Sequence, residues 1–476
     1  MIRTWFLCVL LAMASRSEVC RAQSPSAMPP NVVVILVDDL GWTDLGCQGS
    51  KFYRTPNIDR LAAEGLRFTD AYSACTVCSP TRAALLTGQY PARLHITDWI
   101  AGHQRPQAKL RMPDWTLHLP LETTTIAERF RDAGYATAHI GKWHLGDEEF
   151  GPTKHGFDVN IGGNHRGQPP SYFFPYERES IKLPGLSAGP VGEYLTDRLT
   201  DESLAWIETQ RDRPFFLYLP HYTVHTPLQA PQALTDRYQQ TADKSQPHHN
   251  ATYAAMIDSL DQSVGRILDK LHELKLAEQT IVVFTSDNGG LLGSTTNPPL
   301  RAGKGSAYEG GVRVPLIVRY PPQIKAGIES HIPVMTIDLL PTLSEMAKLP
   351  VRAVAQPPID GVSLVPLLTQ TGKIDREALY WHYPHYHPGG ATPYSAVRVG
   401  DYRLIEFFED GRTELYNLQD DIGEQHNLAA TMPEKRDEML ARLRNWRVEV
   451  GAQLPTPNPN YDPNAAPAKR KGKSKS

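Results

Sequence analysis

The amino-acid sequence predicts an α/β fold with a large central mixed, mostly parallel sheet flanked by helices, followed by a smaller part with an antiparallel sheet and a helix. Two observations support the larger part. Short runs of β-branched and aromatic residues recur along the chain, and helical patterns separate them, an alternation typical of parallel sheets. The runs that we interpret as strands are NVVVILV (31–37), YATAHI (135–140), PFFLYL (214–219), TIVVFT (280–285) and VPLIVRY (314–320).

Helical periodicity is clearest in three segments between these runs, namely TTTIAERFRDAG (123–134), EYLTDRLTDESLAWIETQ (193–210) and YAAMIDSLDQSVGRILDKLHEL (253–274). Their apolar residues recur with the helical period, so each presents one face to a core. Near the C-terminus, residues 394–429 favour antiparallel strands, and PEKRDEMLARLRNWRVEV (433–450) favours a helix. We expect these last elements to form the smaller part of the molecule.

The overall composition is that of an ordinary globular protein. Of the 476 residues, 41% are hydrophobic and 21% are charged, and the formal net charge is −3. This balance argues against a nucleic-acid partner or a membrane-surface partner. Residues 453–476 differ because they are rich in Pro and Asn and then basic, so we expect a disordered tail there.

The N-terminal residues 1–22 have the features of a cleaved secretory signal peptide. An early arginine precedes an apolar run from Trp5 to Ala14, and small residues follow before a plausible cut after Ala22. The run is too short to span a membrane, so we expect a soluble protein that is secreted or periplasmic. Cleavage would leave an odd number of cysteines in an oxidising compartment, Cys47, Cys75 and Cys78.

Cys78 lies in the stretch ACTVCSPTRAALLTG (74–88), immediately before a predicted short helix. Ser79 resembles an N-cap, Pro80 occupies the favoured first helical position, and Gly88 resembles a helix stop. A Cys-x-x-Cys pair can be a redox dithiol or half of a zinc site, but no second pair follows at ligand spacing. One cysteine must therefore be special or free, while Cys47 and Cys75 either pair or stay as buried thiols.

Polar side chains follow four of the predicted strands. Asp38-Asp39 follow the first, Gly141-Lys142-Trp143-His144 the second, His221 and His225 the third, and Asp287-Asn288 the fourth. In parallel α/β sheets the ligand crevice lies beyond the carboxyl ends of the strands, so these groups should meet at one edge.

Each of these groups also has a purely structural interpretation. Asp38-Asp39 can form a turn or an N-cap, Asp287-Asn288-Gly289 is a strong turn signal, a single histidine is more often packed, and Lys142 alone is usually a surface charge. Together, however, three carboxylates repel one another unless a cation lies among them. Oxygen ligands without a nearby thiolate suit a hard ion such as Ca²⁺ or Mg²⁺.

A cationic set accompanies the carboxylates, comprising Arg82, Lys142, His144, His225 and Lys304. A metal beside such groups at a helix N-terminus suits a tetrahedral oxyanion, and sulfate and phosphate esters both qualify.

CSPTRAALLTG resembles the signature of the type I, formylglycine-dependent sulfatases, the arylsulfatase-like and carbohydrate sulfatases. Five further segments are similar to that family's blocks in the same order, and the similarity covers roughly residues 30–450. They are VVVILVDDLGWTDLGCQG (32–49), GKWHLG (141–146), YLPHYTVHTPLQAP (218–231), TSDNGG (285–290) and GKGSAYEGGVRVP (303–315).

The resemblance implies that Cys78 is oxidised to Cα-formylglycine by a formylglycine-generating enzyme during export. It further implies one Ca²⁺ per chain, held by Asp38, Asp39, Asp287 and Asn288 with the modified residue 78 beside the ion. Arg82 would hold the hydrated aldehyde and His144 would be the base. Lys142, His225 and Lys304 would bind sulfate oxygens, and His225 or Lys304 would protonate the leaving alcohol. His225 is chosen over His221, which has the packing interpretation, because Val224 precedes it and Thr226-Pro227 follow it, as in the family.

The resemblance also implies an alkaline-phosphatase-like sulfatase domain over residues 24–370 and a C-terminal antiparallel-sheet subdomain over residues 371–452. The loops 94–115, 162–180 and 381–394 are rich in Trp, Tyr, His and Arg, which favours a sulfated carbohydrate substrate over an aromatic sulfate ester. Two alternative functions remain at this point, a phosphodiesterase or phosphonate hydrolase on the same scaffold and an inactive sulfoglycan-binding protein.

Overall fold

A central eight-stranded sheet carries the fold in the computed structural model, which describes residues 28–178, 181–350 and 358–464. Its strand order is β10-β2-β9-β8-β1-β7-β5-β6. All five predicted strands are present in it. The bounds are β1 (Asn31–Val37), β2 (Leu66–Phe68), β5 (Ala136–Ile140), β6 (Val159–Ile161), β7 (Phe215–Pro220), β8 (Thr280–Ser286), β9 (Leu316–Arg319) and β10 (Ile328–Ser330).

The sheet is mixed and mostly parallel, as predicted. Strands β8, β1, β7, β5 and β6 are parallel neighbours, whereas β9 pairs antiparallel with both β8 and β2. The register brings Val37 of β1 opposite Ser286 of β8, and Leu36 opposite Pro220 of β7. The carboxyl ends of these three strands therefore finish level with one another at one edge of the sheet.

Both faces of the central strand β1 are buried. Val33, Ile35 and Val37 belong to one hydrophobic cluster, and the alternating residues Val32, Val34 and Leu36 belong to another. This alternation explains why the strand is a continuous apolar run, since successive side chains point to opposite faces.

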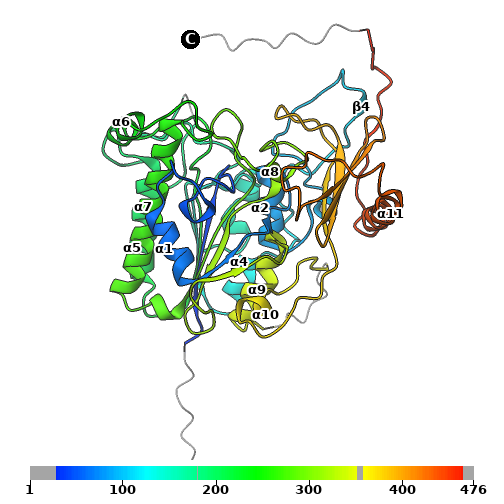
Figure 1. Cartoon of the computed structure of the whole chain (residues 1–476). Helices are drawn as coiled ribbons and strands as arrows, with labels where there is room; N and C mark the ends of the chain where they lie inside the picture. The colour runs from blue at the N-terminus through cyan, green and yellow to red at the C-terminus, as the bar shows by residue number, and fades with distance from the viewer. Residues whose placement is uncertain (1–27, 179–180, 351–357, 465–476) are drawn as a thin grey trace, which may run out of the picture.

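Helices cover the two faces of the sheet (Figure 1). The helices α1, α5 and α7 lie on one side, and α2, α4, α9 and α10 lie on the other. Two of these helices begin at capped residues, since Thr125 and Glu128 form a capping box at α4 and the Asn250 side chain accepts from Tyr253 N at α7. The bounds are α1 (Pro56–Glu64), α2 (Cys78–Thr87), α4 (Ile126–Asp132), α5 (Leu195–Thr209), α7 (Ala251–Glu273), α9 (Leu339–Met346) and α10 (Val365–Leu368).

Shorter elements connect this framework. They are α3 (Pro91–Leu94), α6 (Gln232–Gln239), α8 (Glu309–Val312), the strand pair β3 (Ala71–Tyr72) and β11 (Val334–Met335), and the 3-10 turns η1 (Gly46–Gln48), η2 (Glu148–Phe150), η3 (Pro152–Lys154), η4 (Ala277–Gln279) and η5 (Thr336–Asp338).

The C-terminal part is the predicted antiparallel sheet with a packed helix. Its strands β12 (Leu379–Tyr383), β13 (Tyr394–Val399), β14 (Tyr402–Phe407) and β15 (Thr413–Asn417) form a meander, and α11 (Pro433–Glu449) packs on β13 and β14. The sheet shares a hydrophobic cluster with residues around α2, among them Val77 and Ala84. Trp381 Nε1 also donates to Ser73 O at 2.9 Å. The small sheet thus supports the segment that leads into α2.

The predicted disorder of residues 453–476 is wrong for the part that the structure describes. Residues Thr456–Pro457 form strand β16, which pairs antiparallel with β4 (Leu110–Arg111). The Asn458 side chain donates to the carbonyl oxygens of Pro106 and Ala108 at 2.9 and 2.6 Å. Backbone pairing with another extended segment holds these residues in place, and they are not buried in the core. Such a segment needs no apolar periodicity, and this is why its sequence resembles a disordered tail. The predicted signal peptide and residues 465–476 lie outside the described residues.

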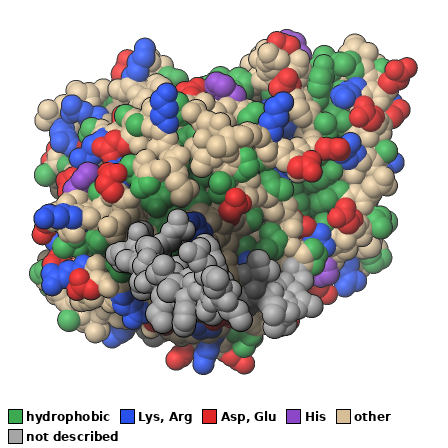
Figure 2. Space-filling model, turned by 90° about the horizontal axis from the view of Figure 1, so that it is seen from below, with side chains coloured by type: hydrophobic (Ala, Val, Ile, Leu, Met, Phe, Trp, Pro, Cys, Tyr) green, Lys and Arg blue, Asp and Glu red, His purple; other side chains and the backbone are tan. Residues whose placement is uncertain are grey.

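Surface charges are mixed, in line with the composition. Figure 2 shows Lys and Arg side chains interspersed with Asp and Glu on the face seen from below. Within the described ranges, no helix combines the length and the apolar character needed to cross a membrane.

Candidate active site

The carboxyl edge of the sheet gathers the predicted polar groups. The backbone pairing continues past the strand ends, since Asp38 N donates to Thr223 O at 3.0 Å and Asp287 N donates to Val37 O at 3.0 Å. Lys142 N likewise donates to Pro220 O at 2.7 Å. The loops that follow β1, β5, β7 and β8 are thereby fixed beside one another. Asp39 and His144, which lie in two of these loops, adopt positive φ angles of 62° and 60°, an uncommon conformation for non-glycine residues that clusters at functional sites.

Three buried carboxylates meet at this edge and each contacts a cation of the protein. Lys142 Nζ donates to Asp38 Oδ2 at 2.6 Å, and Lys304 Nζ donates to Asp39 Oδ1 at 2.6 Å. The third carboxylate, Asp287, accepts from Arg82 Nε through Oδ2 at 2.9 Å. The structure thus brings together the acids and bases that the sequence analysis assigned to a single site.

Asn288 completes the oxygen cluster. Its Nδ2 donates to Asp39 Oδ1 at 2.9 Å, which leaves its Oδ1 atom free to act as a ligand. Three buried acceptors, Asp38 Oδ1, Asp39 Oδ2 and Asn288 Oδ1, have no hydrogen-bond donor among the residues described. Buried polar atoms are nearly always paired, and converging unpaired oxygens suit a hard cation. The residues present therefore fit the calcium ion that the resemblance implies.

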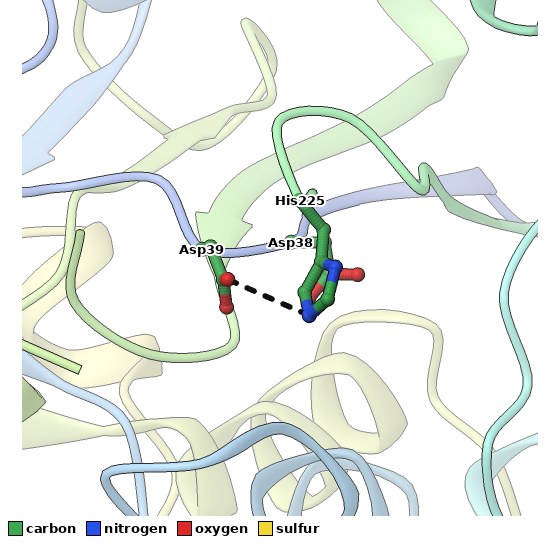
Figure 3. Close-up of side chains that lie close together, drawn as sticks. All are labelled: Asp38, Asp39 and His225. Atoms are coloured by element: carbon green, nitrogen blue, oxygen red, sulfur yellow. Dashed lines mark ion pairs between the residues drawn. The ribbon is translucent and has the colours of Figure 1, made fainter. Parts of the chain in front are cut away.

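His225 lies against the same cluster (Figure 3). Its Nε2 atom is 3.7 Å from Asp39 Oδ2, and Asp38, Asp39 and His225 each offer an atom within 4.8 Å of the others. Because His225 Nδ1 is 2.7 Å from Thr226 O, the proton of the neutral ring lies on Nδ1 and the Nε2 lone pair is free. Two lone-pair atoms that face each other in this way require a proton or a cation between them.

The pKa values at this edge reflect burial and close charges. Burial raises the pKa of Asp38 to about 8, and Lys142 offsets only part of that effect. Burial also opposes ionisation of Asp39, but Lys304 and His225 hold the pKa of this carboxyl below its usual value. A bound divalent cation would favour the charged form of both carboxyls.

Arg82 is fully buried and joins three parts of the site. Besides the bond to Asp287, its Nη1 atom donates to Lys142 O at 2.9 Å, and its Nη2 atom lies 3.8 Å from Asp38 Oδ1. Since Arg82 belongs to α2, these contacts fix the N-terminal turn of that helix against the ends of β1, β5 and β8. Cys78 lies at the start of the same turn.

Helix α2 begins two residues earlier than predicted. Val77 rather than Ser79 is the N-cap residue, so Cys78 is the first residue of the helix, while the predicted stop at Gly88 is confirmed with a φ of 69°. The Ser79 hydroxyl is used elsewhere, because it donates to His144 O at 2.9 Å and accepts from Ile100 N at 3.1 Å. It ties the loop that carries His144 to the helix that carries Cys78.

Cys78 and His144 are in direct contact. The Cys78 Sγ atom lies 3.3 Å from His144 Nδ1, and the opposite ring nitrogen Nε2 contacts Ile100 O. Because a carbonyl can only accept, Nε2 carries the proton and the Nδ1 lone pair faces residue 78. Burial raises the pKa of the Cys78 thiol, which makes the unmodified side chain a weak nucleophile.

The other cysteines show no disulfide within the described ranges. Burial raises the pKa of Cys47 to about 12 and that of Cys75 further still. The alternative of two buried or partly buried thiols is therefore the one the structure shows. His221, in turn, contacts Ser263 Oγ at 3.2 Å, and burial lowers its pKa to about 3, which fits the packing interpretation.

A cavity of about 630 Å³ opens onto Cys78, His144, His225 and Lys304. Lys142 is fully buried against Asp38 and does not line this cavity. The three loops singled out in the sequence supply the rest of the wall, namely Trp99, Ile100, Ala101, His165, Arg166, Gly167, Gln168 and His387.

Two residues that matter for the geometry were not identified from the sequence. Ser79 was interpreted as a helix cap, and Gly167 carried no signal at all. A Cβ atom on Gly167 would lie 2.5 Å from Cε1 of His144, so only glycine leaves room for the imidazole ring. Neither role is visible in a local pattern, because both depend on contacts between separate loops.

Fold and site together define an α/β enzyme of the alkaline-phosphatase-like class. A model of the sulfatase family matches residues 30–349, and one described as "N-sulphoglucosamine sulphohydrolase, C-terminal" matches residues 303–449. The chain belongs to the sulfatase family and is a sulfuric ester hydrolase.

Individual relatives resemble the chain over most of its length. Arylsulfatase A of Homo sapiens is 33% identical over 94% of this chain and 91% of its own. N-acetylgalactosamine-6-sulfatase of Canis lupus familiaris is 34% identical over 83% of this chain and 74% of its own. Among solved structures, Ps i-CgsB in complex with k-i-k-neocarrahexaose is 29% identical, with a TM-score of 0.74 over 91% of this chain and 95% of that one.

Proposed function

We propose that this chain removes sulfate from a sulfated carbohydrate, with residue 78 as formylglycine and with one calcium ion. One observation carries the proposal. Residue 78 contacts the lone pair of His144, shares a cavity with His225 and Lys304, and lies on the helix whose Arg82 bonds Asp287, next to three buried oxygens that lack a hydrogen-bond donor. Nucleophile, base, cationic groups and metal ligands are therefore assembled around one space.

Asp38, Asp39, Asp287 and Asn288 would hold the calcium ion, with residue 78 beside it. Their oxygens match the preference of Ca²⁺, and several of them lack another partner. The ion would lower the cost of bringing a sulfate anion close to three carboxylates. The hydrated aldehyde of formylglycine supplies a hydroxyl nucleophile together with a second hydroxyl through which sulfate can be expelled.

The side chains of the chain itself would manage the protons and the charge. His144 would accept a proton at Nδ1 from residue 78, because its Nε2 atom is already committed to Ile100 O. Burial lowers the pKa of His144 well below its usual value, which keeps the imidazole neutral and able to accept. Arg82 would hold the diol near Asp287, where the guanidinium is fixed.

Lys304 and Lys142, together with His225 once it is protonated, would neutralise the sulfate group. Lys304 and His225 line the cavity and can reach a ligand directly. Burial disfavours the charged form of Lys304, but Asp39 raises its pKa above the usual value, so the ammonium is available to the leaving alcohol. Lys142 would act through Asp38 in the geometry described, at 2.6 Å from that carboxylate.

A carbohydrate suits the cavity better than a small aryl group. The cavity measures about 630 Å³ and its wall contains Trp99, His165, Arg166 and His387, side chains that stack on sugar faces or contact hydroxyl groups. The names of two similar proteins point the same way, since one is called N-acetylgalactosamine-6-sulfatase and one solved structure is described as a complex with k-i-k-neocarrahexaose. We infer export through residues 1–22 and maturation by a formylglycine-generating enzyme that reads Cys78, Pro80 and Arg82.

An activity screen tests this function. Protein produced together with a formylglycine-generating enzyme is incubated with a panel of defined sulfated saccharides and with matching phosphate esters. We expect sulfate release from at least one saccharide and much slower release of phosphate. Faster turnover of phosphate esters or phosphonates would overturn the assignment in favour of a phosphohydrolase, and binding without turnover of any ester would indicate a sulfoglycan-binding protein.

A further inference from the structure

A second cavity adjoins the one that contains Cys78. It measures about 400 Å³ and shares Arg166 and Gln168 with the first cavity. Its remaining wall is formed by Pro169, Pro170, Arg178, Ile181, Thr226 and Pro227. Thr226 and Pro227 follow His225 directly in the chain, so this one segment contributes to the walls of both cavities.

The charged residues described in the wall of the second cavity are all positive. Arg166 and Arg178 both line it, and no Asp or Glu among the residues that the structure describes does. Both arginines are exposed, and neither forms an ion pair with any residue in the described ranges. Two arginines that line one small cavity repel each other electrostatically, and an anion bound between them would remove this repulsion. The planar fork of arginine fits the oxygens of a sulfate or a carboxylate.

The backbone holds both arginines in a fixed relation to the catalytic loop. His144 N donates to Asn164 O at 3.0 Å, and the Asn164 side chain accepts from Arg166 N at 2.9 Å. The same side chain donates to Lys182 O at 3.2 Å, and Arg178 and Ile181 exchange two backbone hydrogen bonds. Asn164 therefore links His144 to both arginine-bearing segments, which is the arrangement expected of a built subsite.

We propose that the second cavity is a subsite for a further anionic group of the substrate, so that the substrate is a saccharide with at least two anionic groups. One group is the sulfate ester presented to residue 78. The other is a sulfate or carboxylate that Arg166 and Arg178 bind. This inference rests on the proposed sulfatase function and narrows its substrate class.

Calorimetric binding measurements test the subsite without requiring the true sugar to be known. The calcium-loaded wild-type protein is compared with the double variant Arg166→Ala/Arg178→Ala and with Arg211→Ala. This control removes an exposed arginine that lies just after the C-terminal end of α5. The probes are inorganic sulfate, sucrose octasulfate, and a monosulfated disaccharide that contains a uronic acid. Thermal melting checks that all three proteins fold.

We expect the double variant to bind sucrose octasulfate at least about tenfold more weakly than the wild type, because two charge-assisted contacts are lost. Inorganic sulfate should lose any binding at the second cavity in the double variant and keep its binding beside residue 78, and Arg211→Ala should match the wild type with every probe. Weakened binding of the uronic acid disaccharide in the double variant would identify carboxylate as a ligand, and unchanged binding would restrict the subsite to sulfate.

Equal binding of sucrose octasulfate by the wild type and the double variant would overturn the inference. So would an equal loss in Arg211→Ala, because binding would then follow net charge alone. Failure of the proposed function is a separate result, seen as the absence of sulfate ester turnover in wild-type protein whose residue 78 has been modified.

Discussion

Cys78 Sγ and His144 Nδ1 lie 3.3 Å apart although 66 positions separate the two residues in the chain. The contact depends on the parallel order of β1, β7 and β5, which brings the loop after β5 beside the start of α2. It also depends on Ser79, whose hydroxyl joins the backbone of His144 to that of Ile100. The chemistry proposed for residue 78 therefore rests on a hydrogen bond made by its neighbour.

Ser79→Ala should lower kcat and leave formylglycine formation intact. Without the hydroxyl, His144 O and Ile100 N stay buried without a hydrogen-bond partner, which should lower the free energy of unfolding by about 1–3 kcal/mol. The His144 ring would also be free to move. Urea unfolding and kcat per modified chain measure the two effects. Thr87→Ala, which removes a hydroxyl that bonds Ala83 O within the same helix, is the matched control. An equal fall of kcat in both variants would show that Ser79 acts only through stability.

Gly167→Ala should reduce kcat by up to about 10²-fold, because the new methyl group would displace the His144 ring by a fraction of an ångström to an ångström. Steady-state kinetics on the best saccharide, with thermal melting as a fold check, measures the effect. Gly372→Ala, where the nearest atom to the new Cβ would be 3.6 Å away, serves as the control. Wild-type kinetics in Gly167→Ala would mean that the His144 position is not critical.

Asp38→Ala should abolish calcium binding and activity together, since the remaining oxygens carry too little charge for a hard cation. Elemental analysis of desalted protein gives the metal content, and we expect about one calcium per chain in the wild type. Asp98→Asn tests a second buried carboxyl, one that accepts from Tyr383 Oη at 2.7 Å and lies outside the oxygen cluster. This control should retain calcium. An active, calcium-free Asp38→Ala protein would refute the metal site.

The segment after residue 452 should contribute to stability. Asn458→Ala removes hydrogen bonds to Pro106 O and Ala108 O, and we expect a loss of about 1–2 kcal/mol in the free energy of unfolding, measured with urea. Asn464→Ala removes no side-chain hydrogen bond within the described residues, because the contact of Asn464 with Asp462 is made by its backbone N, and it should leave stability unchanged. If both variants unfold like the wild type, the contacts of this segment do not contribute to the free energy of unfolding.

How much of this could be predicted from the sequence depends on the range of the interactions. Asp38, Asp39, Asp287 and Asn288 were placed at one edge because buried parallel strands have a strong local signature and their carboxyl ends meet. The antiparallel direction of β9 was not predictable in this way, because a short apolar run has the same composition in either direction. The same limit applies to the site, where the roles of Ser79 and Gly167 arise only from contacts between distant loops.

At the end of the chain, the sequence predicted disorder where the structure has an ordered strand. Residues 453–464 have the composition of a disordered segment, and composition describes what a segment can bury, not which strand edge it meets. The pairing with β4 and the Asn458 side-chain hydrogen bonds do not require an apolar pattern, so the composition gives no sign of them. Helix α2 illustrates a smaller error, since Ser79-Pro80 is a good start signal but the chain begins the helix at Cys78.

Cys78→Ser separates the proposed nucleophile from an ordinary one. Serine offers a single hydroxyl, so attack on sulfur remains feasible, but no second hydroxyl exists through which sulfate can be expelled. This variant should lose steady-state turnover and accumulate up to one covalently bound sulfate per chain on residue 78, detected by peptide mass spectrometry. Cys75→Ser, a buried neighbour, should keep turning over without sulfate on residue 75. Many turnovers by Cys78→Ser at the wild-type rate would contradict the need for an aldehyde.

The central claim, that formylglycine at position 78 performs the reaction, is tested most directly by relating modification to activity. Protein batches produced with increasing amounts of a formylglycine-generating enzyme are digested, and mass spectrometry gives the fraction of residue 78 present as aldehyde. The same batches are assayed for sulfate release from the best saccharide of the panel. We expect specific activity to rise in proportion to that fraction and to vanish where residue 78 is entirely thiol. Full activity in a batch whose residue 78 is an unmodified cysteine would contradict the account.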